Sequence, residues 1–480
     1  MVIKKLISLL LILTFTFIIV GCGNTDTTEG DGVVAEETNH AIDLDGYEFV
    51  FATGIDIANP IGIQPYFPAE GTSEPGDAIL VRYREIEAEY NCTIVEKKVN
   101  DWYQKELFAA VATGEKYADT INTLSETAYV VYRADMLETY SGSEFFDLSS
   151  GKWGSKLALD LVSFDGVNCY GVQPDLWPIS ERGSGIYNAV LFNPDVIQYY
   201  QQPDPYELQE QGTWDWANFE QIAVNCTEGE GAEKKYGISS QHDDFAISSI
   251  YSNNGQMVKK VDDKYVYGYT DTCVIDAINW MQDLMFNKQV IGTSTTDWWG
   301  GMKIFSTGRS AFHVGRSFFG LTVPTGTVAD EKFPSSMLKN GYGWIPFPYG
   351  PNSNKDDWNI IFDCVERFFV VPVGTDDPSI SMRIMDDMFK PIEGVDDWKQ
   401  YYRRYLFFEE KGFNNFMKMI DTAETSYLHI YDGWDGRQYI VNAFTDLMRN
   451  AKKSPIQTVE SLKDRYQQMI DERLNNIVTE

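Results

Sequence analysis

Cysteine and histidine are scarce in this chain and are never closely spaced. Six cysteines and four histidines are spread over 480 residues, and no two cysteines have the CxxC spacing of a zinc or redox site. The histidines lack the HExxH spacing of a metalloprotease. We therefore expect no metal site and no cofactor. Most of the cysteines are expected to be small core residues, and their pairing is left open.

Positive charge is also in short supply. The chain has 39 Lys and Arg residues against 71 Asp and Glu residues, for a net charge of −32. Proteins bind nucleic acids and anionic membrane surfaces largely through lysine and arginine. The folded body is therefore not expected to bind nucleic acid, and we interpret its acidity as an aid to solubility.

Long apolar runs are absent apart from one, from Leu6 to Val20, which follows Lys4 and Lys5. The run is shorter than the roughly 20 residues that a membrane-spanning helix needs, so residues 1–21 are predicted to be a cleaved export signal. The Gly21-Cys22 pair resembles a bacterial lipobox, although Ile19 and Val20 depart from the usual residues. That resemblance implies that Cys22 becomes the lipidated first residue. The alternative is a single-pass anchor with an ordinary Cys22.

Residues 22–44 are polar, acidic and rich in glycine and threonine, and we expect them to form a flexible tether. From Tyr47 the pattern changes to alternating strands and helices. Strands are expected at 47–53, 92–99 and 118–122, with helices at 77–90 and from 101 to about 114. This order predicts parallel strands with helices on both faces of a sheet. The length predicts two or three domains.

Four motifs resemble those of the extracellular solute-binding proteins of family 1, the sugar-capturing subunits of bacterial ABC importers related to maltodextrin-binding protein. The first, residues 305–321 (FSTGRSAFHVGRSFFGL), combines a glycine turn, a short apolar strand and an aromatic pair. The others are residues 186–192 (IYNAVLF), residues 212–216 (GTWDW) and residues 341–350 (GYGWIPFPYG). They follow one another in the family's order across most of the chain, and we find no internal repeat.

The resemblance implies a fold, a function and a location. The fold would be α/β and two-lobed, of the class II periplasmic-binding-protein kind, with a hinge between two mainly parallel sheets flanked by helices. The N-terminal lobe would comprise residues 45–165 plus 315–363, and the C-terminal lobe residues 166–314 plus 364–480. The chain would be a monomer, anchored by lipid on the extracellular face of the cell membrane. It would capture a carbohydrate, with an oligosaccharide favoured, and deliver it to ABC permease subunits by hinge closure.

Ligands of parallel sheets bind beyond the carboxyl ends of the strands, and sugars need aromatic rings together with planar polar groups. The loops in those positions supply eight candidate ligand-binding residues: Glu181, Phe318, Asp56, Glu126, Arg182, Gln241, His242 and Asp243. Two more candidates come from aromatic segments: Trp434, before the last helices, and Trp298, before the 305–321 motif. By resemblance, Glu181 would contact sugar hydroxyls and Trp434 would stack on a sugar ring. For each loop residue the alternative is a capping, packing or solvated side chain.

No catalytic residues are expected, because no acidic pair, GxSxG or P-loop stands out by motif. Three alternatives stay open at this point. The chain could be a surface lipoprotein enzyme acting on polysaccharide, a solute-binding protein for peptides or another solute, or a sensory or adhesion lipoprotein.

Overall fold

The structure is a computed structural model. It describes residues 42–54, 66–100, 102–178, 180, 182–241, 243–293, 299–322, 338, 340–362, 366–427, 430 and 433–475, with the backbone alone over 433–438. The predicted signal peptide, Cys22 and nearly all of the tether lie outside these residues. A compact unit begins at Ile42, close to the predicted end of the tether. Within the described part, no helix is long and apolar enough to cross a membrane.

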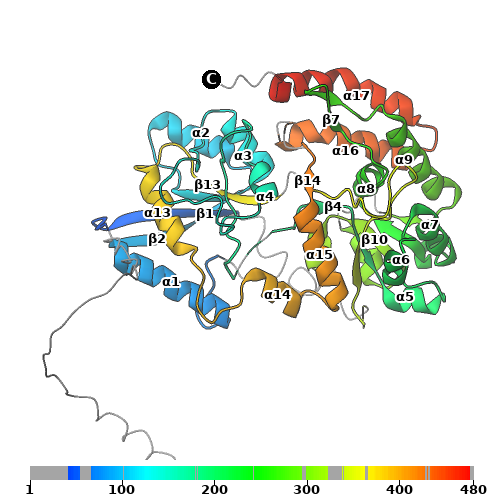
Figure 1. Cartoon of the computed structure of the whole chain (residues 1–480), viewed down its shortest axis with the longest axis horizontal. Coiled ribbons are helices and arrows are strands. Elements are labelled where there is room, and N and C mark those ends of the chain that lie inside the picture. Colours follow the sequence, from blue (N-terminus) through cyan, green and yellow to red (C-terminus); the bar gives the residue numbers. More distant parts are fainter. Residues whose placement is uncertain are drawn as a thin grey trace, which may run out of the picture. The chain divides into compact units, whose positions relative to one another are not determined.

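The first sheet is built from the N-terminal strands and one late strand, in the order β13-β3-β1-β2. Its members are β1 (Tyr47–Gly54), β2 (Cys92–Val99), β3 (Thr120–Leu124) and β13 (Arg367–Val370). β1 pairs in parallel with β2 and β3, and β13 pairs antiparallel to β3. Every residue of β3 is buried, as expected of a strand covered on both faces. Figure 1 shows this sheet with α1 (Glu74–Tyr90), α2 (Gln104–Thr113) and α13 (Pro378–Met388) around it.

The second sheet has the order β11-β5-β10-β6-β9. Its members are β5 (Ala189–Phe192), β6 (Tyr236–Ser240), β9 (Ile291–Gly292), β10 (Ser310–Gly315) and β11 (Gly343–Pro346). The apolar strand of the 305–321 motif is the central strand β10, which is buried throughout. It pairs in parallel with β6 on one side and antiparallel with β5 on the other.

A small third sheet, of order β14-β12-β4, connects the two larger ones. It consists of β4 (Ile186–Tyr187), β12 (Ile361–Phe362) and β14 (Glu424–Thr425). Asn188 separates β4 from β5 and has a φ of 67°. Asparagine tolerates this left-handed conformation better than most residues, so the Tyr-Asn motif marks the point where the chain passes from the third sheet into the second.

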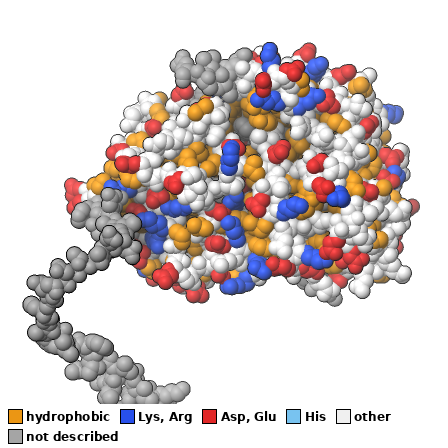
Figure 2. All heavy atoms as spheres, viewed as in Figure 1, with side chains coloured by type: hydrophobic (Ala, Val, Ile, Leu, Met, Phe, Trp, Pro, Cys, Tyr) orange, Lys and Arg blue, Asp and Glu red, His pale blue; other side chains and the backbone are white. Residues whose placement is uncertain are grey.

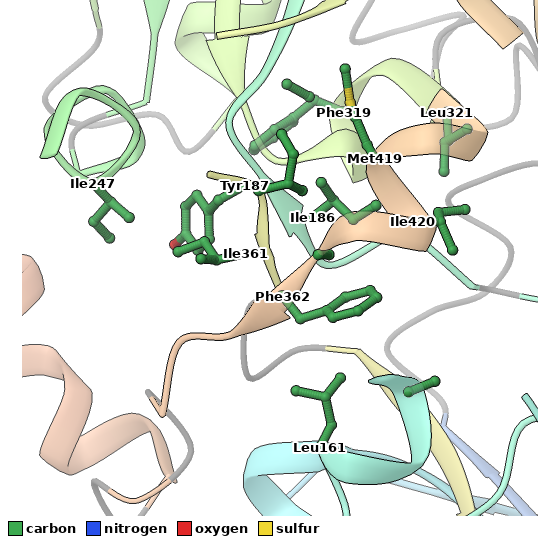
Figure 3. Close-up of a cluster of buried hydrophobic side chains, with 14 of the residues drawn as sticks. Leu161, Ile186, Tyr187, Ile247, Phe319, Leu321, Ile361, Phe362, Met419 and Ile420 are labelled. Carbon is green, nitrogen blue, oxygen red and sulfur yellow. The ribbon is translucent and has the colours of Figure 1, made fainter. Parts of the chain in front are cut away.

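Apolar side chains hold the third sheet in place (Figure 3). Ile186 and Tyr187 of β4 and Ile361 and Phe362 of β12 are all buried. Ile247, from α8 (Asp244–Ser252), lies to one side of them, and Leu161 lies below Phe362. This cluster joins segments from both halves of the fold.

The strand pairings differ from the predicted lobe segments in three places. β11 pairs with β5 in the second sheet, although residues 315–363 were assigned to the first lobe. β13 pairs with β3 in the first sheet, although residues 364–480 were assigned to the second. Val172 also bridges to Phe369, so the first sheet extends past residue 165. After β10 the chain returns to the second sheet as β11, which pairs with β5, so residue 315 is not a crossing to the first sheet.

The remaining elements cover the sheets or join them. They are α3 (Ser125–Tyr132), α4 (Lys156–Asp160), α5 (Pro194–Tyr199), α6 (Pro205–Gln211), α7 (Trp216–Asn225), α9 (Thr272–Gln282), α10 (Gly300–Ser306), α11 (Ser317–Thr322), α14 (Trp398–Tyr405), α15 (Glu410–Thr422), α16 (Gly433–Arg449), α17 (Pro455–Ile470) and the hairpin of β7 (Val258–Val261) and β8 (Lys264–Tyr267). Cys92, Cys169, Cys226 and Cys273 are free, and the first three are buried.

Candidate functional site

Half of the predicted ligand-binding residues have described side chains. These are Glu126, Arg182, Gln241, Asp243 and Phe318. Asp56, Glu181, His242 and Trp298 lie outside the described residues, and Trp434 is described only by its backbone, near the start of α16.

Gln241 and Asp243 follow β6 at the edge where β10 also ends. Val314 of β10 lies opposite Ser240 of β6 in a parallel pair, so both chains leave the sheet at the same edge. Gln241 is 0% exposed and Asp243 is 1% exposed. Among the described residues, no hydrogen-bond partner reaches the Gln241 side-chain amide or Oδ2 of Asp243. Each buried polar group without a partner lowers the stability of the fold by about 1–3 kcal/mol. This edge therefore holds polar atoms whose hydrogen-bonding capacity the described residues leave unused.

Arg316 joins the end of β10 to the third sheet. Its Nε lies 3.4 Å from Oδ1 of Asp244 and donates a hydrogen bond of 3.1 Å to the hydroxyl of Tyr187. The guanidinium carbon also lies 5.2 Å from the centre of the Tyr187 ring. All three side chains are buried, so the ion pair fixes the edge of the second sheet against β4.

His313 lies beneath this edge, within β10. Its Nδ1 is 3.1 Å from Oγ of Ser239. Burial lowers the pKa of His313 to about 3, because an apolar interior disfavours the charged imidazolium. His313 is therefore a neutral member of the core at physiological pH.

The segment from Ser180 to Tyr187 links the second sheet to the first. On one side Ser317 donates to the carbonyl of Gly183 and accepts from the N–H of Ile186 at 3.1 Å. The N–H of Phe318 donates to the carbonyl of Ser184 at 3.0 Å. These bonds tie the segment to the loop that follows β10.

On its other side the segment is held by Glu366, just before β13. The Glu366 carboxylate accepts from the N–H groups of Gly183 and Gly185, each at 2.9 Å, and from the Gln173 amide at 3.0 Å. Burial raises the pKa of Glu366, and these hydrogen bonds, with the nearby charge of Arg182, act in the opposite direction. Glu366 is 0% exposed, so it is a structural clamp on the connecting segment.

Glu126 belongs to the same assembly through the first sheet. It is the second residue of α3, directly after β3, and is 1% exposed. The N–H of its neighbour Ser125 donates to the Glu366 carbonyl at 2.8 Å. The carboxyl end of β3 is therefore bonded to Glu366, which also holds the segment that contacts the loop after β10.

Arg182 is held by the protein itself. Its guanidinium forms a buried ion pair with Asp175, whose other oxygen accepts from Nζ of Lys399 at 2.7 Å. The guanidinium carbon lies 6.0 Å from the centre of the Trp398 ring. Through these contacts Arg182 positions the connecting segment, residues 180–187.

Phe318 supplies an aromatic surface next to the polar edge. It is half-buried, and its ring centre lies 5.6 Å from those of Trp299 and Phe319. Phe319 is fully buried. Of the predicted aromatic pair, Phe318 is thus the ring with accessible surface.

Sequence reasoning missed Glu366 and the Arg316–Asp244–Tyr187 group. Arg316 lies in the 305–321 motif and Asp244 directly follows the candidate Asp243, but their pairing depends on which strands are neighbours. The role of Glu366 could not be predicted from the sequence, because a single acidic residue before an apolar run is found at the start of many strands.

The arrangement is suited to recognising a neutral polar ligand. Glu126 follows the end of β3, Gln241 and Asp243 follow the end of β6, and Phe318 follows the end of β10. Among the described residues, no group of three or more His, Cys, Asp or Glu side chains could hold a metal ion. The site therefore offers hydrogen bonds and an apolar ring face, the two requirements of carbohydrate recognition.

Comparison with solved structures identifies the class of fold. The GacH receptor of Streptomyces glaucescens, solved unliganded and with acarbose, superposes with a TM-score of 0.60 at 14% identity, over 89% of this chain and 99% of that one. An ABC substrate-binding protein of Listeria monocytogenes, solved with cycloalternan, gives 0.57 at 13% over 90% and 100%. UgpB of Mycobacterium tuberculosis, solved with glycerophosphocholine, gives 0.59 at 13% over 90% and 100%.

The chain therefore has the two-lobed α/β fold of ABC-transporter solute-binding proteins, which confirms the predicted fold class. No protein-family profile and no curated protein sequence matches the chain. The likeness is one of fold, at identities of 13–14% for these three structures.

Proposed function

We propose that this chain is the solute-binding protein of an ABC importer and that it binds a carbohydrate, in particular an oligosaccharide, between its lobes. The observation that carries the proposal is the edge at the ends of β6 and β10, where buried atoms of Gln241 and Asp243 have no partner among the described residues. A ligand with several hydroxyl groups would supply those hydrogen bonds.

Ligand contacts would come from both lobes. Glu126 would contribute from the first sheet, and Gln241, Asp243 and Phe318 from the second. The other candidates, Glu181, Asp56, His242, Trp298 and Trp434, would complete the site. Because each lobe provides part of it, ligand would favour the closed arrangement through its additional affinity for that state.

In this proposal the chain is a monomer, tethered through lipid on Cys22 to the extracellular face of the membrane, and permease subunits recognise its closed form. The visible face carries Lys and Arg interspersed with Asp and Glu (Figure 2). Nucleic acid is not among the proposed partners, because the chain has 71 Asp and Glu residues against 39 Lys and Arg residues.

A thermal-shift screen tests the proposal, with mono- and oligosaccharides as candidates and peptides as the comparison class. A ligand at 100 times its Kd stabilises the folded state by about 2.7 kcal/mol, which gives a readily measured rise in Tm. Stabilisation by one saccharide family supports the proposal. Stabilisation by peptides alone would show that the chain binds another class of solute. Chemical conversion of a glycan by the purified protein would show that the chain is an enzyme.

A further inference from the structure

A cavity lies beside the third sheet, at its β14 edge. Its volume is about 380 Å³, and Glu424 and Thr425 of β14 form part of its wall. The candidate ligand site is at the opposite edge of this sheet, where Tyr187 of β4 contacts Arg316. Binding sites for small molecules commonly have volumes of about 300–1,000 Å³, so the cavity is large enough for one small organic molecule.

The helix α8 separates the cavity from the candidate ligand site. Asp244, at the first turn of α8, belongs to the candidate site, whereas Tyr251, at the last turn, lines the cavity. Seven residues at 1.5 Å each separate these positions by about 10 Å along the helix axis. The cavity is therefore distinct from the site proposed for carbohydrate.

The walls of the cavity come from parts of the fold that belong to different sheets. Leu157 and Asp160 of α4 form one wall, and the chain that follows α4 is tied to the first sheet through the bridge from Val172 to Phe369. The opposite wall includes Tyr265 of the β7–β8 hairpin, and β14 belongs to the third sheet. The size of the cavity thus depends on the angle between the lobes.

The charged groups around the cavity are paired, with one exception. Nζ of Lys260 lies 3.4 Å from Asp263, Lys259 pairs with Asp271, and Lys156 lies 2.7 Å from Asp160. In the described part of the chain, Glu424 has no ion pair. One carboxylate is left to attract a cation.

Tyrosine rings stand next to this carboxylate. Tyr265 and Tyr427 line the cavity, and their ring centres lie 5.4 Å apart. Burial raises the pKa of Tyr427, and the neighbouring Tyr265 and the carboxylates of Glu424 and Asp160 raise it further. Tyrosine faces and a carboxylate together are the surroundings that bind organic ammonium groups, through cation–π and charge attraction.

We propose that this cavity is a second binding site, for a small organic monocation of the quaternary-ammonium kind, and that its occupation biases the angle between the lobes. Glu424, whose side chain is exposed, supplies the counter-charge. Tyr427 supplies the ring face, because Nζ of Lys260 already lies over the Tyr265 ring, 5.8 Å from its centre. Because a cation there contacts α4, the hairpin and β14 together, it stabilises the lobe angle at which these three walls fit it.

Ligand-observed NMR titration of the full-length chain with choline chloride tests the site. Its matched control ligand is 3,3-dimethyl-1-butanol, which replaces the ammonium nitrogen of choline by carbon and has no charge. We expect saturable choline binding with a Kd of about 1 mM or tighter and binding of the neutral alcohol weaker by about tenfold or more. Equal affinity for the two, or no saturable choline binding, would overturn the proposal.

The variant Glu424→Gln locates the cation. It keeps the size of the side chain and removes its charge, so choline affinity should fall by about tenfold. Glu89→Gln, on an exposed part of α1, is the control and should bind choline as the unaltered chain does. An unchanged affinity in Glu424→Gln would place choline elsewhere and overturn the assignment.

The effect on the lobe angle is tested by small-angle X-ray scattering with and without saturating choline. A reproducible change in the radius of gyration is expected in the unaltered chain and not in Glu424→Gln, and an unchanged radius in both would overturn the coupling. Neither measurement requires a carbohydrate, so their outcome is independent of the proposed function.

Discussion

The carboxylate of Glu366 accepts a hydrogen bond of 2.9 Å from the backbone N–H of Gly183. It accepts a second of the same length from Gly185. The residue just before β13 of the first sheet thereby holds the segment that leads into the second. The contact connects the architecture of the fold to its candidate site, because the same segment contacts the loop after β10.

Replacing Glu366 by alanine should destabilise the protein. The N–H groups of Gly183 and Gly185 would be left without an acceptor in a buried place, and we expect the free energy of unfolding to fall by about 3 kcal/mol. Urea unfolding measures the change. Glu393→Ala, at an exposed carboxylate, should change the value by no more than about 0.5 kcal/mol. Equal stabilities for the two variants would show that Glu366 is not a clamp.

Gln241 should show opposite effects on stability and on binding. Gln241→Met keeps a similar volume and removes two buried polar atoms that have no partner among the described residues. We expect the free energy of unfolding without ligand to rise by about 1 kcal/mol and carbohydrate affinity to fall by about tenfold or more. Urea unfolding and calorimetric titration give the two values. A less stable variant with unchanged affinity would contradict this role.

Arg182 should matter for stability through its pair with Asp175. Arg182→Met leaves Asp175 with Lys399 as its remaining partner. We therefore expect the free energy of unfolding to fall by about 2 kcal/mol, less than the 3–5 kcal/mol typical of a buried charge left without any partner. The double variant Arg182→Met with Asp175→Asn should recover part of the lost stability, because it also removes the carboxylate that Arg182 neutralised. A stable Arg182→Met protein that no longer binds carbohydrate would instead place Arg182 in contact with ligand.

His313 should contribute to loss of stability in acid. The pKa of His313 is lowered from 6.5 to about 3 in the folded state. Between pH 3 and pH 6.5, His313 is therefore protonated in the unfolded chain and neutral in the folded one. Above pH 6.5 His313 does not lower the free energy of unfolding. As the pH falls from 6.5 towards 3, protonation of the unfolded chain lowers it by up to about 1.4 kcal/mol per pH unit. Urea unfolding from pH 4 to 7 should show a shallower dependence for His313→Gln than for the unaltered chain. Parallel curves would contradict the buried, neutral state.

The elements most faithfully predicted from the sequence are those with a sustained pattern. The predicted helix over 77–90 is confirmed by α1, which buries Ile79, Tyr83, Ile86 and Tyr90 on one face. Parallel pairing among β1, β2 and β3 is confirmed as well. These features depend on short-range periodicity, which the sequence shows directly.

The routes between the lobes could not be predicted as well. β4, β12 and β14 have two residues each, too few to give a periodic signal. The partner of a strand such as β11 or β13 is set by long-range packing. The loops after the strands stay a prediction as the region of the ligand site. The hydrogen bonds of Glu366 could not be predicted, because they depend on the same long-range packing.

The most direct test of the central claim is calorimetric titration of the full-length chain with the saccharide selected by thermal shift, followed by mass analysis of the recovered ligand. We expect one saccharide bound per chain, recovered chemically unchanged, with at least tenfold weaker binding by Gln241→Met. A saccharide recovered as cleaved products, or no saccharide bound while peptides bind, would contradict the account.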